Sequence, residues 1–299
     1  MRSAHAEDRL GTVASGPLLW RAHPVQSGWQ AELVLRFEAR GPRTVLAARR
    51  HRGPLTVQRP FHPEGDGVCH TYVLHPPAGI VGGDELAMTF AVEPGAHALV
   101  TTPAATRWYF SHGREARLRQ EATVAPGGLL EWLPQETLLF AGAHARLATR
   151  IALHGDARFL GWEILGLGRP ACDEPFQDGR LDFRFELARD GRPLLLEHLR
   201  GGADGVAGMR GHTAAATLLA TPAGDAALAA ARAALADDSD VLPDGPAVLA
   251  GATRIGDLVA VRGLAARCEP LVRAFVRVWA ALRPHVVGRV AVAPRIWHT

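Results

Sequence analysis

Apolar and polar residues alternate along the chain between residue 29 and about residue 200. Every second residue from Trp29 to Phe37 is apolar, and the residues between them are mostly polar. A period of two is typical of a half-buried β-strand, because successive side chains point to opposite faces of a sheet. The same pattern predicts four further strands, over residues 86–92, 115–124, 145–153 and 181–187.

Turn-forming residues separate these predicted strands at short intervals. Clusters containing glycine with proline or aspartate lie at residues 93–95, 125–128, 154–156 and 189–192. Many short strands joined by such turns predict a mainly β sandwich, barrel or stacked sheet, whereas alternating βαβ units would need helices between the strands. The turn-and-strand units differ too much in sequence to define a repeat.

Two helices are predicted, both late in the chain. Residues 225–236 are rich in alanine and begin with an aspartate, which favours a helix start. The second helix is predicted over residues 264–282, with Pro270 in its first turn and Pro284 ending it. Its wide apolar face consists of Leu264, Cys268, Leu271, Val272, Phe275, Val276, Trp279 and Leu282. This face either docks on the sheet or binds a partner. The acidic residues 236–246 predict a loop between the two helices.

Composition excludes several mechanisms. The chain has 299 residues, which suits a single domain, and all 33 of its Lys+Arg residues are arginine. Without lysine it has no Schiff-base nucleophile and no phosphate-loop lysine. The net charge is +3, and the densest basic cluster, residues 49–52, is too short to favour nucleic-acid binding.

The terminal and cysteine patterns indicate a cytoplasmic protein. Three cysteines lie far apart at Cys69, Cys172 and Cys268, so a disulfide framework is not expected. The first twenty residues lack the apolar core of a secretory signal. No stretch approaches the length of apolar sequence that crosses a membrane. We therefore expect neither a membrane nor a nucleic acid as a partner.

The segment at residues 69–84 (CHTYVLHPPAGIVGGD) concentrates residues that could carry chemistry. It predicts a strand over residues 70–74, which the two prolines end, and then a glycine-rich turn. The turn lacks the lysine and hydroxyl residue of a phosphate loop. Cys69, His70 and His75 are ligand types suited to nickel, zinc or copper. An odd spacing, however, would direct His70 and His75 to opposite faces of a strand.

Carboxylates form a second group of candidates. Glu131 and Glu163 have apolar neighbours on both sides, and a buried carboxylate has to be paired or to coordinate a cation. Pairing with arginine and binding of a metal both remain open for these two. The other members of the group are Asp84, Glu85, Glu136, Asp173 and Glu174. No serine, cysteine or histidine pattern supports nucleophilic catalysis.

Six blocks, in order along residues 20–298, resemble those of one known protein family. Residues 75–84 resemble the family signature HPPGGIVGGD, with Ala78 where the family usually has glycine, a change expected to cost little. Residues 101–109 (TTPAATRWY) have Arg107 where the family commonly has lysine. The remaining blocks are LEWLPQE at 130–136, GWE at 161–163, LGR at 167–169 and PRIW at 294–297. The family that these six blocks resemble is the urease accessory protein UreD (UreH) family.

The resemblance implies a non-enzymatic urease maturation factor. Such a protein would bind the urease apoprotein and recruit UreF and the GTPase UreG for nickel insertion, without a tightly bound cofactor. It also implies a single domain over residues 1–299, with residues 1–19 flexible. The implied fold is a stacked, solenoid-like arrangement of sheets with two helices near the C-terminus. The rival interpretations are a β-rich interaction module without a metal role and, less favoured, a metal-dependent hydrolase.

The resemblance also implies an internal path for nickel, and this gives the carboxylates a hypothetical role. The residues that we expect along the path are Cys69, His70, His75, Asp84, Glu85, Glu131, Glu136 and Glu163. Weak, transient sites suit transfer better than a closed cage of ligands. A second hypothesis makes the last helix a contact for UreF, through Leu271, Arg273, Phe275, Arg277 and Trp279.

Overall fold

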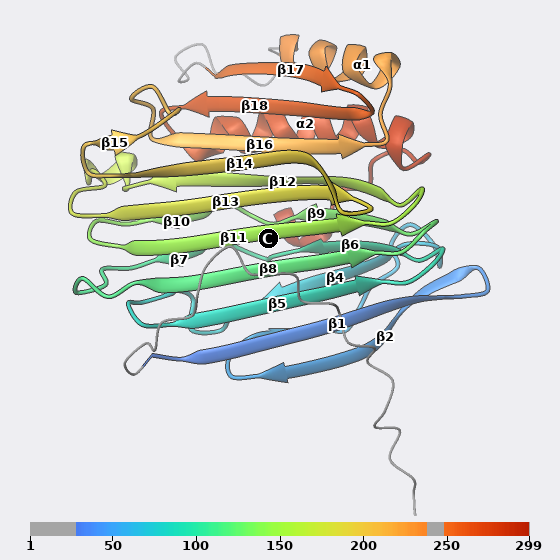
Figure 1. Cartoon of the computed structure of the whole chain (residues 1–299), viewed down its shortest axis with the longest axis horizontal. Helices are drawn as coiled ribbons and strands as arrows, with labels where there is room; N and C mark the ends of the chain where they lie inside the picture. The colour runs from blue at the N-terminus through green and yellow to red at the C-terminus, as the bar shows by residue number, and fades with distance from the viewer. Residues whose placement is uncertain (1–27, 238–247, 299) are drawn as a thin grey trace, which may run out of the picture.

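Two β-sheets stacked face to face form the body of the protein (Figure 1). The computed structural model describes residues 28–237 and 248–298. The eight-stranded sheet has the order β15 (Gly205–Val206), β14 (Arg192–Gly202), β13 (Arg180–Arg189), β11 (His144–Leu153), β8 (Ala116–Val124), β5 (Glu85–Val92), β1 (Gln30–Arg40), β2 (Arg43–Arg52). The second sheet has the order β17 (Leu249–Ile255), β18 (Leu258–Ala265), β16 (Ala214–Thr221), β12 (Arg158–Leu167), β9 (Leu129–Leu133), β6 (His97–Thr101), β4 (Cys69–Leu74), β3 (Thr56–Val57), with β10 (Thr137–Leu139) pairing β12 and β7 (Thr106–Trp108).

The chain winds between the two sheets as a coil. After β5 it crosses to β6, returns to β8, crosses to β9, and returns to β11, so that successive strands of each sheet are parallel. Leu86 aligns with Leu118, and Leu118 aligns with Leu147. One turn of the coil therefore takes about 30 residues. This confirms the mainly β, solenoid-like fold, and the coils need no sequence repeat because only their alternation of buried and exposed positions has to match.

Antiparallel strands lie at both ends of the coil, where the parallel pairing stops. The β1–β2 hairpin closes one end of the eight-stranded sheet, and the β13–β14 hairpin lies near the other. In the second sheet β16, β18 and β17 form an antiparallel meander beyond β12. The five strands predicted from alternation are all present, and the strand predicted over residues 70–74 is β4.

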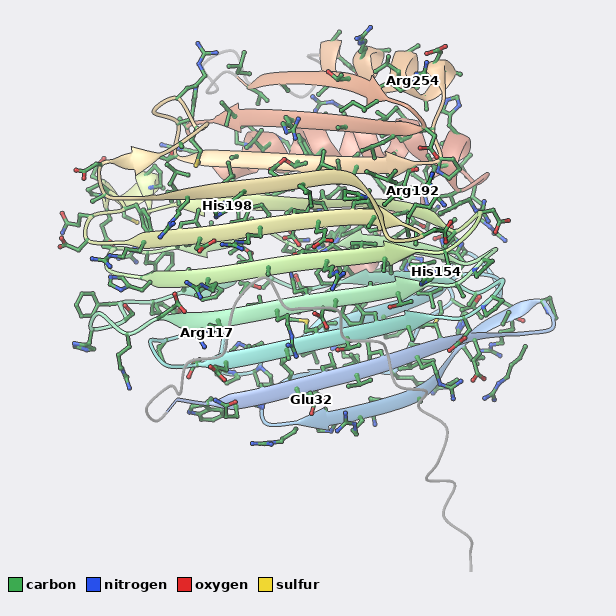
Figure 2. All side chains as sticks on the ribbon, in the orientation of Figure 1. Glu32, Arg117, His154, Arg192, His198 and Arg254 are labelled. Carbon is green, nitrogen blue, oxygen red and sulfur yellow. The ribbon has the colours of Figure 1, made fainter. Side chains whose placement is uncertain are left out.

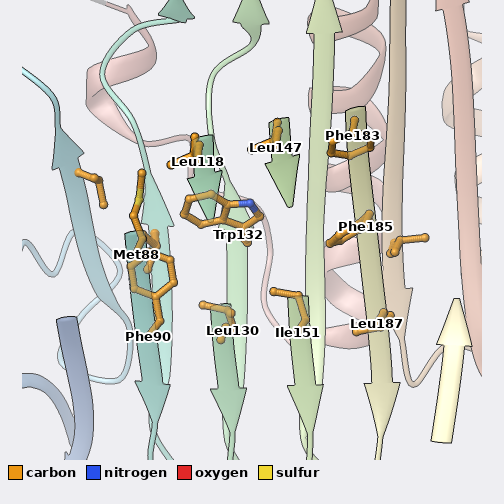
Figure 3. Packing of buried hydrophobic residues seen from close by; sticks show 14 of the residues in the cluster. Met88, Phe90, Leu118, Leu130, Trp132, Leu147, Ile151, Phe183, Phe185 and Leu187 are labelled. Atoms are coloured by element: carbon orange, nitrogen blue, oxygen red, sulfur yellow. The ribbon is translucent and has the colours of Figure 1, made fainter. Parts of the chain in front are cut away.

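The main core lies between the two sheets (Figure 3). Rows of side chains that are in register on neighbouring strands fill it. In the eight-stranded sheet, one such row has Leu147 between Leu118 and Phe183. Trp132 faces these rows from β9, and its ring lies 5.4 Å from that of Phe90. The burial of each side chain of this size contributes roughly 1.5–3 kcal/mol to the free energy of folding, so the sheet-to-sheet contact dominates the stability of the body.

Helices α1 (Asp225–Ala236) and α2 (Cys268–Val286) cover the outer side of the second sheet. The α1 prediction is confirmed at both ends. The α2 prediction was wrong at both ends, because Leu264 belongs to β18 and Pro284 lies inside the helix. Near the C-terminus of a helix, a proline disturbs only the last turn, and here Gly288 in the left-handed region (φ 77°) follows the helix end.

Two short 3₁₀ helices, Pro170–Cys172 and Arg295–His298, complete the described structure. The segment 1–19, predicted to be flexible, and most of the predicted acidic loop lie outside the described residues.

Candidate functional site

Glu131 lies at the centre of a buried charged cluster between β9 and α2. Its side chain has no exposed surface and accepts hydrogen bonds from the Arg283 guanidinium at 3.0–3.2 Å. The Trp279 indole donates at 2.8 Å, and His97 Nε2 lies 2.8 Å from the other oxygen. Burial alone would raise the pKa of Glu131, but His97 and Arg283 outweigh it and lower the pKa to about 2. Glu131 is therefore ionised and paired with arginine.

The cluster continues through Arg283 to a second carboxylate. Arg283 contacts Glu64 at 2.7 Å, and Glu64 lies 2.7 Å from His70 Nε2. Burial alone would raise the pKa of Glu64. The hydrogen bonds from His70 and Arg283 and their charges outweigh burial, so the pKa lies below its ordinary value. The buried Nδ1 atom of His70 has no hydrogen-bond partner among the residues that the structure describes. We call Glu64, His70, His97, Glu131 and Arg283 the helix-side cluster.

Glu163 has different surroundings, on the opposite face of the same sheet. Three neutral donors bond its Oε1 atom, namely the Thr149 hydroxyl at 2.7 Å, the Trp132 indole at 3.0 Å and the Gln120 amide at 3.1 Å. Burial raises the pKa of Glu163, and these three bonds only partly oppose the effect. Arginine pairing thus holds for Glu131, but the groups that bond Glu163 are uncharged.

The remaining predicted carboxylates serve the local fold. Asp84 is buried and accepts the backbone N–H groups of Trp29 and Val81, each at 2.9 Å. Glu85 is half-buried and pairs with Arg117 at 3.1 Å. Glu136 is half-buried, and its charge adds to burial in raising the pKa of the Cys268 thiol to about 12. None of these three carboxylates lies within the helix-side cluster.

The soft ligand types are also separated. Cys69 belongs to the core between the sheets, and burial raises the pKa of its thiol, which contacts the Thr71 hydroxyl at 3.8 Å. His75 lines a cavity of about 130 Å³ with apolar neighbours such as Leu86 and Met88. Burial lowers the pKa of His75 against the opposing charge of Asp84, which favours the neutral, ligand-competent imidazole.

The structure does not gather the eight predicted path residues into one site. Within residues 28–237 and 248–298 no three His, Cys, Asp or Glu side chains are grouped so that they could hold a metal ion together. His70 and Glu131 face α2, whereas Cys69 and Glu163 face the space between the sheets. The second sheet therefore separates the two sets.

The apolar residues predicted to contact a partner are core residues of this chain. Leu271, Phe275 and Trp279 are at most 1% exposed and pack against the second sheet, which corrects the expectation of a free apolar face. Arg273 and Arg277 remain on the outer side. They line a groove of about 280 Å³ together with Pro134, Gln135, Trp162, Ile164, Val272, Val276, Ala293 and Trp297. This groove, which we call the α2 groove, is mostly apolar and carries two cations.

Sequence reasoning missed Glu64, His97 and Arg283. Arg283 follows Trp279 by four residues, so the helical period places it on the buried face of α2, and a cation on such a face signals a buried partner. For Glu64, which lies in a loop, the sequence contains no comparable signal.

Charged side chains spread over the outer face of the eight-stranded sheet. Figure 2 shows Arg117 and His198 toward one end of the strands and His154 and Arg192 toward the other. Among the described residues, neither helix combines the length and the apolar character that crossing a membrane requires. The fold and its interior define a β-solenoid protein with a covering helical layer and a charged cluster beneath it.

The family follows from comparison with known proteins. A family model described as UreD urease accessory protein matches residues 30–298. The chain is 46% identical to the urease accessory protein UreD of Klebsiella aerogenes, over 92% of this chain and 99% of that protein. It is 44% identical to UreD of Citrobacter koseri over the full length of both, and 42% identical to UreD of Alcanivorax borkumensis over 96% and 98%. The chain belongs to the UreD urease accessory protein family, whose members act in urease maturation and are not enzymes.

Proposed function

We propose that the chain is a scaffold that binds the urease apoprotein, recruits UreF and UreG, and lets nickel pass through its interior during insertion. The single observation that carries the nickel step is Glu163, a buried carboxyl between the sheets to which three neutral groups donate hydrogen bonds and which forms no ion pair within residues 28–237 and 248–298. A passing divalent cation would meet a ligand there that no arginine already occupies. The neutral His75 at the edge of a cavity supports the same route.

The helix-side cluster would take no part in the path as it stands. Arg283 and His97 already satisfy Glu131, and a metal ion would have to displace a bidentate guanidinium to bind it. We therefore narrow the expected path to the side between the sheets. Its candidate ligands are Cys69, His75 and Glu163, whereas Asp84, Glu85 and Glu136 keep their local structural contacts.

The test is co-expression of the urease apoprotein with its other accessory proteins, with and without this chain. Without the chain we expect urease with little nickel and low activity. Glu163→Gln keeps the shape of the side chain and its hydrogen-bonding capacity but removes the ionisable ligand, so nickel content should fall several-fold while the complex still purifies. Glu121→Gln, on the outer face of β8, is the matched control and should behave as wild type.

One observation favours the interaction module without a metal role. The predicted ligands are dispersed among the described residues rather than grouped. If Glu163→Gln and Cys69→Ala both fold and leave nickel content unchanged, while removal of the whole chain abolishes activation, then the chain acts by binding partners alone.

We assign UreF to the α2 groove, because a mostly apolar groove flanked by Arg273 and Arg277 suits an apolar segment that carries carboxylates. Reversing both charges, Arg273→Glu with Arg277→Glu, should weaken UreF binding at least ten-fold. Arg59→Glu, at an exposed position outside the α2 groove, is the control. Unchanged affinity of the double variant would remove UreF from this groove. The recruitment of UreG follows only from the resemblance described above.

A further inference from the structure

Exposed apolar side chains gather where strands β1, β5 and β8 begin. Trp29, Val81, Tyr109 and Phe110 are 59%, 42%, 36% and 56% exposed. All four lie immediately before these strands or in the loops that lead to them. The three strands begin at the left of Figure 1. We call these four residues the turn ridge. Large apolar side chains clustered on the surface mark interaction sites more often than scattered ones do.

The turn ridge is held rigidly by its own turns. The buried Asp84 carboxylate accepts the backbone N–H groups of Trp29 and Val81 and so ties two neighbouring turns together. The Tyr109 ring lies so close to Gly79 that a Cβ there would be 1.9 Å from it. The Phe110 ring covers Gly142 in the same way, at 2.1 Å.

Backbone hydrogen bonds continue this support from turn to turn. Ser111 donates to the Gly142 carbonyl, and Gly142 donates to the Gln177 carbonyl. Fixed aromatic groups of this kind lose little conformational freedom when a partner covers them, which is why rigid aromatic residues often dominate binding energy.

A charged groove adjoins the turn ridge. The Phe110 ring packs against His112 with centroids 4.7 Å apart, and the next residue, Gly113, lines a groove of about 500 Å³. This groove, the arginine groove, is lined by Gly113, Glu115, His144, Ala145, Arg146, Arg180, Leu181, Asp182, Arg200, Gly201 and Gly202.

Two of its arginines are available to a partner. Arg146 is held by Glu115 at 3.1 Å and lies 3.8 Å from Asp182. Arg180 and Arg200 are exposed, and neither forms an ion pair within the part of the chain that the structure describes. The free charge of the groove is therefore positive, and planar guanidinium groups favour bidentate contact with carboxylates.

The turn ridge and the arginine groove lie away from α2. They occupy the strand starts and the eight-stranded sheet, whereas the α2 groove is formed by α2 and the second sheet. A protein bound at one surface would leave the other free, so two partners could be held at once.

We propose that the turn ridge and the arginine groove form one docking surface for a protein that presents carboxylates beside an exposed apolar side chain, and that in urease maturation this protein is the urease apoprotein. The inference rests on the proposed scaffold function and assigns a second partner to a second surface. Apolar anchors supply affinity in such an interface, and the charge pairs supply orientation and a fast, salt-dependent approach.

The test measures the affinity of the full chain, alone or with UreF bound, for purified urease apoprotein at low and high salt. Arg180→Glu with Arg200→Glu should weaken binding at least ten-fold at low salt and flatten its salt dependence. Phe110→Ser should weaken binding several-fold at both salt concentrations. Arg192→Glu, at the opposite end of the strands, and Leu249→Ser, exposed on β17, are the matched controls.

The outcomes separate the two proposals. If the wild-type chain binds no apoprotein, the scaffold function fails. If the wild type binds and the variants bind equally well, with unchanged thermal unfolding, the surface assignment fails. Loss of UreF binding in place of apoprotein binding would also overturn the assignment. Arg180→Gln with Arg200→Gln provides a milder pair, which should retain folding and show an intermediate loss.

Discussion

Two buried glutamates in this chain sit on one sheet and differ in almost every physical respect. Glu131 is ionised because Arg283 and His97 compensate its burial, and its pKa lies near 2. Among the described residues, Glu163 accepts hydrogen bonds from the neutral groups of Trp132, Thr149 and Gln120, and burial raises its pKa. Glu131 is thus an anion that its ion pair with Arg283 holds in place, whereas these three partners of Glu163 are all uncharged. Only the second suits transient binding of a cation.

Glu131→Gln should destabilise the protein by about 3 kcal/mol, because it leaves the buried Arg283 charge without its main partner. Denaturant unfolding at neutral pH measures the loss. Glu163→Gln is the comparison and should leave the free energy of unfolding unchanged or raise it, since no charge loses a partner. Equal destabilisation by both substitutions would contradict the distinction.

Stability should depend on pH with opposite signs at the two sites. Glu131 has a folded pKa of about 2 against 4.5, so its stabilising contribution is complete above pH 4.5 and is lost as the pH falls toward 2. Glu163 has a raised folded pKa, so its contribution is favourable at low pH and weakens as the pH rises above 4.5. Unfolding of wild type and Glu163→Gln from pH 3 to 7 should therefore diverge with rising pH.

Ala78 adopts the left-handed region with φ 63° in the turn after β4. A Cβ in this region is strained, so the substitution of glycine by alanine costs more than the sequence comparison implies. Ala78→Gly should stabilise the chain by about 0.5–1 kcal/mol, the relief of strain being partly offset by the greater freedom of glycine in the unfolded chain. A higher melting temperature would show it, and a lower one would argue against strain at this turn.

At the scale of elements, α2 acts as the cover of the second sheet and as the source of its charge compensation. Close approach is possible because Gly263 faces the helix, where a Cβ would lie 2.7 Å from the Leu271 side chain. Phe275 fills the same region without exposed surface. The helix is therefore a part of the core, and only its outer side, with Arg273 and Arg277, is open to partners.

Phe275→Ala should cost about 3–5 kcal/mol, because a buried aromatic ring is lost and a cavity remains. Arg273→Ala, on the outer side of the same helix, removes one exposed pair with Glu269 and should change the free energy of unfolding by less than about 1 kcal/mol. Chemical denaturation of both variants provides the measurement. A small effect of Phe275→Ala would mean that α2 is loosely docked.

Strands β1, β5, β8, β11 and β13 and helix α1 were predictable because their periodicity is local, whereas α2 was predicted with the wrong ends. Alternation around Leu33 and Leu35 marks β1, and the apolar spacing of Leu271, Phe275 and Trp279 marks α2. The pairing of strands was less accessible, since the same alternation suits a sandwich, a barrel or a coil. Glu131 was singled out by its apolar neighbours, but its partner Arg283 lies 152 residues away, and sequence spacing carries no information about that contact.

At the scale of the whole molecule, the coil brings distant parts of the chain together through one guanidinium. Arg283 in α2 contacts Glu131 in the middle of the solenoid and Glu64 near its start, across 152 and 219 residues. Removal of residues 266–299 should therefore abolish cooperative unfolding of the whole chain, because it uncovers the second sheet and leaves both carboxylates without Arg283. A truncated chain that melts as sharply as the full chain would show that the solenoid is self-sufficient.

The position of Arg283 also bears on how the chain matures during its own synthesis. Every strand that the structure describes precedes α2 in the chain, so the ribosome makes the second sheet before it makes the helix that covers this sheet. Until α2 has been made, the nascent protein carries an uncovered apolar sheet and two carboxylates that lack their counter-ion. The synthesis of α2 thus completes the cover of the second sheet, and a newly made chain would be most vulnerable to aggregation before it.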